Sequence, residues 1–130
     1  MSENTQNIEE HAEGAAHCLV ELVIALENGV LEYPLEAHRI HSYLTRVAGE
    51  MGTALDLIQA CVQGLHEKGR LMSDYRGEPL EDVLQRFNQS SGRARVLARE
   101  LNNHLSEAYS AVGHLAYKDV PDKEREATAN

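Results

Sequence analysis

The sequence contains no tryptophan, one phenylalanine and five tyrosines, so aromatic residues make up only 5% of the chain. Proline occurs only three times. β-Branched residues nowhere gather in the alternating apolar and polar pattern that is typical of a strand. No segment is therefore expected to form a strand, and the sequence favours an all-α protein.

Long apolar runs and a basic leader are also lacking. No stretch approaches the roughly 20 apolar residues that a membrane-spanning helix needs. The first residues, from Met1 to Glu13, are acidic and polar, unlike a secretory signal or a transit peptide. We therefore expect a cytoplasmic protein with no membrane partner.

Positive charge is scarce. Twelve lysines and arginines stand against 21 acidic residues, which gives a formal net charge of -9. Such a charge repels phosphate backbones and anionic lipid, so nucleic acid is an unlikely general partner.

The two cysteines, Cys18 and Cys61, each stand among leucine, valine and isoleucine, and neither has a second cysteine at metal-ligand spacing. We expect both to be buried, reduced thiols.

At 130 residues the chain has the length of one domain. Apolar spacings of three and four predict helices over about 5–28, 34–68 and 79–118. Gly29 and Gly69 mark the ends of the first two, and Pro34 and Pro79 the starts of the last two. We expect one helical-bundle domain over residues 1–120 and a disordered tail over 121–130, which has no apolar periodicity.

A seven-residue repeat of apolar residues runs through both long segments and predicts an antiparallel hairpin. Together with the helix of the first segment, this hairpin is expected to form an antiparallel bundle of three helices, of which the first is the shortest. Polar residues at 88–92 weaken the third segment, but the repeat continues across them, so we favour one continuous helix over a break that would make four. If Leu65 faces Leu80, then His41 faces His104. The repeat positions of the second segment are Ala37, Leu44, Met51, Ile58 and Leu65, with Ile40, Val47, Ala54 and Cys61 between them; those of the third are Leu80, Phe87, Ala94, Leu101, Ala108 and Leu115, with Leu84, Ser91, Ala98, Leu105 and Val112.

The first segment is too short to cover the whole hairpin, so apolar residues near the loop end are left without a third helix. A second copy of the chain is the expected cover, which predicts a homodimer; another helical protein is the other expected partner. The interface residues would be Ile58, Val62, Leu65, Leu80, Leu84 and Phe87.

Seven histidines raise the question of a metal, since helical bundles can present histidine and glutamate from facing helices. His41, His104 and Glu107 are the candidate ligands. The paired Glu-x-x-His motif of di-iron bundles is lacking, however, and a hydrogen-bonded polar layer without a metal is the other interpretation. We expect no cofactor.

Four arginines, Arg86, Arg93, Arg95 and Arg99, lie in an acid-free stretch from Val83 to Arg99. They are candidates for docking an acidic partner or nucleic acid. The simpler interpretation pairs them with acidic residues of neighbouring helices, namely Glu9, Glu10, Glu13 or Glu50.

No sequence motif indicates catalysis. A nucleophile elbow and a glycine-rich phosphate loop are both lacking, and we expect no enzyme. The favoured hypothesis is a non-enzymatic interaction, scaffolding or regulatory module that forms a homodimer. The alternatives are a metal- or small-ligand-binding bundle with a histidine and glutamate layer, and a nucleic-acid-associated regulator that uses the arginines.

Overall fold

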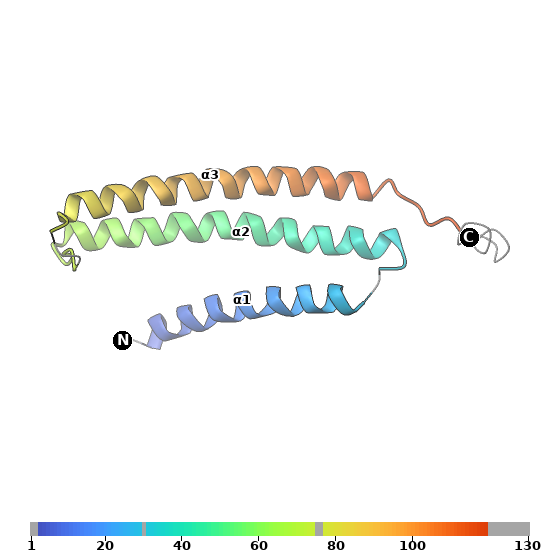
Figure 1. Ribbon diagram of the computed structural model, residues 1–130, viewed down its shortest axis with the longest axis horizontal. Coiled ribbons are helices and arrows are strands. Elements are labelled where there is room, and N and C mark those ends of the chain that lie inside the picture. The colour runs from blue at the N-terminus through green and yellow to red at the C-terminus, as the bar shows by residue number, and fades with distance from the viewer. Residues whose placement is uncertain (1–2, 30, 75–76, 120–130) are drawn as a thin grey trace. The chain divides into compact units, whose positions relative to one another are not determined.

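The computed structural model describes residues 3–29, 31–74 and 77–119 (Figure 1). It contains three α-helices: α1 (Glu3–Asn28), α2 (Pro34–Glu67) and α3 (Leu80–Val112). Helix accounts for 81% of these residues, and none of them is in a strand. The predicted all-α fold is confirmed. Within the same residues, no helix has the length and apolar character to cross a membrane.

The chain divides into two compact units, residues 1–33 with α1 and residues 34–130 with α2 and α3. In α1, Leu22 is half-buried, and the side chains described from Thr5 to Asn28 are otherwise exposed. The packing of the first helix on the hairpin and a single domain over 1–120 stay predictions. The predicted disordered tail, 121–130, lies outside the described residues.

The ends of α2 follow from local sequence. Pro34 is the first helical residue, where its missing N–H breaks no hydrogen bond, and Glu36 stands in the first turn. At the other end Gly69 adopts a left-handed φ of 67°. The N–H of Gly69 donates to the carbonyl of His66, and that of Arg70 donates to the carbonyl of Leu65, each at 3.0 Å. This is a Schellman motif, and its positive φ favours glycine.

Helix α3 begins after Pro79, which is extended at φ -63° and ψ 146° and whose carbonyl accepts from the N–H groups of Asp82 and Val83. The helix is continuous through residues 88–92, as predicted. It ends at Val112, however, and the predicted end near residue 118 is wrong. The N–H groups of His114 and Leu115 bond to carbonyls three residues earlier, so the chain tightens after Gly113 and leaves the α-helical path.

Helices α2 and α3 lie side by side in opposite directions and form a hairpin (Figure 1). Asp56 pairs with Arg95, while His38, nearer the start of α2, stacks on Tyr109, nearer the end of α3. The predicted facing pairs, Leu65 with Leu80 and His41 with His104, are wrong by about one turn.

The register follows the smallest side chains. Ala48, Ser91 and Ala98 are the buried residues in the described part of the chain, and Ala48 is only 2% exposed. A Cβ placed on Gly52 would lie 3.8 Å from Cβ of Ala98. The two backbones therefore approach closely where both helices have alanine, serine or glycine, and this approach sets which residues face each other.

The contact between the helices corrects the predicted repeat on α2. Six of its predicted contact positions are exposed: Val47, Met51, Ala54, Ile58, Cys61 and Leu65. Three predicted positions, Ala37, Ile40 and Leu44, are covered, and the other covered positions of the contact are His41, Ala48, Gly52, Leu55, Gln59 and Val62. On α3 the predicted repeat holds from Leu80 to Val112, apart from Leu101, which is exposed; Leu115 lies beyond the helix and is also exposed. We call the covered residues of the two helices the seam.

Candidate functional site

One side of the hairpin is lined by exposed apolar residues. On α2, Val47, Met51 and Ile58 each come one residue before a seam residue, and on α3 Leu97 and Leu101 do the same. One residue turns a helix by about 100°. Because the two helices are antiparallel, this same rotation brings both sets to the same side of the hairpin. We call this surface the apolar face; it comprises Val47, Met51, Ile58 and Leu65 of α2 and Leu97 and Leu101 of α3.

The six predicted interface residues divide into two groups. Ile58 and Leu65 belong to the apolar face and are 53% and 43% exposed. The other four are half-buried and lie on the sides of α2 and α3 that face each other: Val62, Leu80, Leu84 and Phe87. The seam therefore already uses part of the predicted interface, whereas Ile58 and Leu65 remain open.

The four arginines do not form one strip. Arg86 pairs with Glu78 in the loop before α3, and Arg95 pairs with Asp56 of α2. Within the described residues, Arg93 and Arg99 make no ion pair, and none of the four pairs with Glu50. Pairing with Glu9, Glu10 or Glu13 would join the two units and stays a prediction.

The predicted metal ligands are not brought together. His104 and Glu107 lie on the exposed side of α3, with His104 Nδ1 3.7 Å from Glu107 Oε2. His41 is half-buried on α2, and its Nδ1 has no hydrogen-bond partner in the part of the chain that the structure describes. Across residues 3–29, 31–74 and 77–119, no group of three histidine, cysteine or acidic side chains is placed to hold a metal.

Both cysteines are free thiols, but their predicted burial is wrong. Cys18 and Cys61 are exposed. Cys61 comes one residue before Val62 of the seam and three after Ile58, so it lies at the edge of the apolar face. Its aliphatic neighbours suggested burial, but Ile58 and Leu65 lie on a side of α2 that α3 does not cover.

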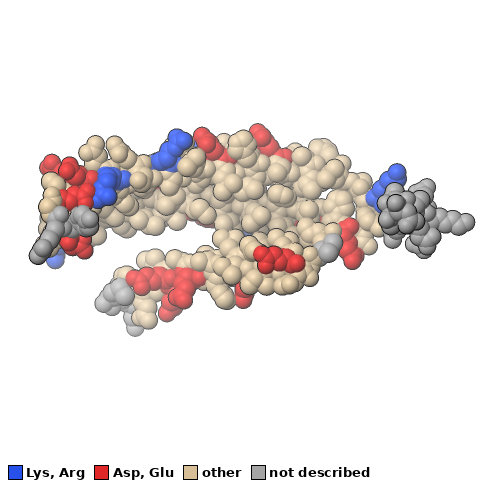
Figure 2. Space-filling view, viewed as in Figure 1, with Lys and Arg blue, Asp and Glu red and all other residues tan. Residues whose placement is uncertain are grey.

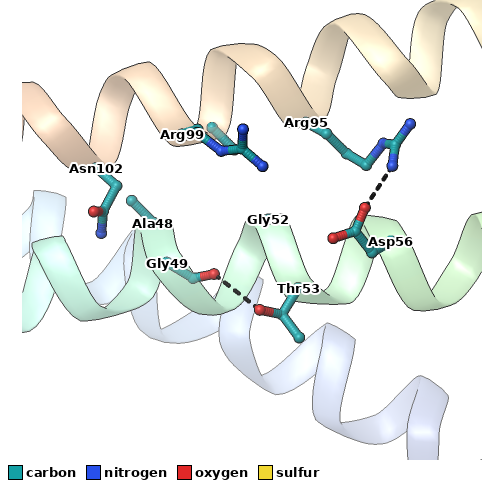
Figure 3. Close-up of a pocket in the computed structure, with 9 residues that line it drawn as sticks. Ala48, Gly49, Gly52, Thr53, Asp56, Arg95, Arg99 and Asn102 are labelled. Carbon is teal, nitrogen blue, oxygen red and sulfur yellow. Dashed lines mark hydrogen bonds and ion pairs between the residues drawn. The ribbon is translucent and has the colours of Figure 1, made fainter.

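A pocket of about 190 Å³ opens in the middle of the hairpin, between α2 and α3 (Figure 3). Ala48, Ala98 and the two glycines supply the space. Arg95 Nη1 donates a hydrogen bond to Asp56 Oδ1 at 2.6 Å. The residues that line the pocket are Ala48, Gly49, Gly52, Thr53, Asp56, Arg95, Ala98, Arg99 and Asn102.

Sequence reasoning found Arg95 and Arg99 but did not connect them with the α2 residues of this pocket. The arginines are four residues apart, and Gly49 and Gly52 three apart, so each pair shares one side of its helix. That pattern alone does not say which pair lies opposite which. The register of α2 against α3 decides which residues face each other, and the predicted register was wrong by about one turn.

Comparison of the chain with protein-family models, with curated proteins and with solved structures finds no match.

Proposed function

We propose that this protein is a non-enzymatic interaction module that associates with a second copy of itself through the apolar face of the hairpin. The observation that supports the proposal most is the contrast between buried and exposed residues. The hairpin buries alanine and serine, while valine, methionine, isoleucine and leucine side chains of the apolar face are exposed. An apolar surface of this kind is a common mark of a protein interface.

Helix α1 is shorter than the hairpin, and the apolar face is exposed in the structure. Helix α1 has 26 residues and α2 has 34, or roughly 39 Å and 51 Å at 1.5 Å per residue. In any arrangement, α1 of the same chain is therefore too short to cover the hairpin from end to end. A second copy offers the same apolar face, and an isologous contact would convert two hairpins into a four-helix bundle.

Charge limits the other partners. The space-filling view shows an uncharged expanse along the hairpin, with charged side chains mainly along the outer edge of α3 and near the ends (Figure 2). The net charge of -9 disfavours nucleic acid and anionic lipid. Binding to a second copy buries the apolar face and, unlike binding to nucleic acid or anionic lipid, needs no basic surface on this protein.

The test is sedimentation equilibrium of wild type and two matched variants. Ile58→Glu introduces a charge on the apolar face, and Leu57→Glu introduces the same charge one residue earlier, at a side chain that is 62% exposed. We expect a wild-type dimer at micromolar concentration, a monomer for Ile58→Glu and a dimer for Leu57→Glu. Circular dichroism should show the same helix content in all three. A species of 14.5 kDa for wild type at every concentration would contradict the proposal.

A further inference from the structure

The pocket of the hairpin lies on the side opposite the apolar face. Gly49 and Thr53 each follow a seam residue of α2, and Arg95 and Arg99 each follow a seam residue of α3. Five residues of the apolar face precede covered residues, and the sixth, Leu65, lies two helical turns after Ile58 on the same side of α2. Relative to the seam, the pocket residues are therefore turned about each helix axis in the direction opposite to the residues of the apolar face. A partner that covers the apolar face leaves the pocket open.

The positive charges that line the pocket outnumber the negative ones. It contains two arginines and one carboxylate, that of Asp56, which is paired with Arg95. Arg99 makes no hydrogen bond or ion pair in the described part of the chain, although acidic residues outnumber basic ones 21 to 12. In Figure 3 its guanidinium group lies on the α3 side of the pocket, as does that of Arg95, with Gly49, Gly52 and Thr53 on the α2 side.

A second group in the pocket lacks a partner. The Nε atom of Arg95 is buried and has no hydrogen-bond partner among the residues described. A buried donor without an acceptor destabilises the structure, and such donors are nearly always satisfied by protein, water or ligand. Arg99 thus has N–H groups without a partner, Arg95 has a donor without an acceptor, and the glycines leave space beside the two side chains.

We propose that this pocket binds a small oxyanion, a carboxylate or phosphate group, through Arg99 and Arg95. A planar guanidinium group donates two parallel hydrogen bonds to such groups, and these bonds are among the strongest in proteins. The hydroxyl of Thr53 donates to the carbonyl of Gly49 at 3.4 Å, and its oxygen keeps lone pairs that accept a hydrogen bond from the O–H group of a protonated ligand. The volume of about 190 Å³ has room for one such group. This site is independent of the self-association proposed above.

The test is a titration of the full chain with sodium phosphate and, separately, with sodium acetate, followed by the amide NMR signals of Gly49, Gly52 and Thr53. Sodium chloride keeps the ionic strength constant. Saturable shifts of these three signals support the site, and the tighter of the two anions identifies the chemistry of the group. Shifts that do not saturate, or that spread over all surface amides, would mean an adventitious ion only and would overturn the proposal.

Two charge-matched variants and one space-filling variant separate the site from general electrostatics. Arg99→Gln should weaken binding about tenfold or more, because it removes the charged donors. Arg93→Gln removes the same charge from α3 outside the pocket and should leave binding within about twofold. Gly52→Ala fills the pocket with a methyl group at an ordinary contact distance of 3.8 Å from Ala98, so the hairpin should fold while binding weakens. Equal losses for Arg99→Gln and Arg93→Gln would overturn the proposal.

Discussion

Asn102 of α3 donates a hydrogen bond from Nδ2 to the backbone carbonyl of Thr45 of α2 at 2.8 Å. The bond is half-buried and joins residues 57 positions apart in the sequence. It lies next to Gly49, where an added Cβ would come within 3.2 Å of the same Nδ2 atom. The amide therefore occupies the space that glycine leaves, and it holds the two helices in one register.

Replacing Asn102 should destabilise the hairpin. Asn102→Ala removes the donor and leaves the carbonyl of Thr45 without this partner, at a cost of about 1 kcal/mol in the free energy of unfolding. Asn103→Ala is the matched control, because Asn103 is exposed on the same helix. Urea unfolding followed by circular dichroism measures both. Equal midpoints for the two variants would show that the hydrogen bond contributes nothing to stability.

The close approach of the two helices should not tolerate a larger side chain. At Ala48, which is the most buried residue described, a leucine must push the helices apart, which costs about 1–3 kcal/mol. Ala60→Leu makes the same change on an exposed position of α2 and should have little effect on stability. Thermal unfolding of the two variants provides the comparison. A hairpin that accepts Ala48→Leu without loss would mean that α2 and α3 do not pack through small residues in solution.

The ion pair between Asp56 and Arg95 should matter more for anion binding than for stability. Both side chains are partly exposed, and pairs of this kind contribute about 0.2–1 kcal/mol. Asp56→Asn removes the negative charge from the pocket and frees Arg95, so phosphate should bind more tightly than to wild type. Glu50→Gln removes the same charge from α2 outside the pocket and serves as the control. Equal affinity in both variants would argue against Asp56 as a competitor for Arg95.

The exposed Cys61 thiol should report on self-association. In a Cys18→Ser variant, a thiol reagent should modify Cys61 rapidly in dilute native protein. The rate should fall as protein concentration rises, because a second copy on the apolar face covers the thiol. In the Ile58→Glu background the rate should not depend on concentration. A concentration-independent rate in both backgrounds would locate any self-association elsewhere.

Local features of the sequence were sufficient for predicting the helices. Pro34, Gly69 and Pro79 mark ends that depend on the φ angle or the missing N–H of a single residue, and the structure has those ends within a residue or two. The end of α3 was wrong because Leu115 continues the apolar repeat beyond Gly113, where the hydrogen bonding changes. A repeat predicts which residues are apolar on one side, but not where the backbone leaves the helix.

The site was predictable only in part. The apolar residues Ile58 and Leu65 and the cations Arg95 and Arg99 were found from spacing and composition. Their partners were not found, since Asp56, Thr53 and Asn102 are ordinary residues of a polar helix surface until the opposite helix is placed beside them.

By itself, the sequence determined that the chain is helical, where α2 begins and ends, and that α3 continues through residues 88–92, because backbone conformation depends on residues within a few positions of one another. Only the tertiary structure decided which side of α2 meets α3. The apolar repeat pointed to Met51 and Ile58, yet the helices meet through Ala48 and Gly52, because close packing depends on the small residues of both helices at once. That choice exposes the apolar face and opens the arginine pocket on the opposite side.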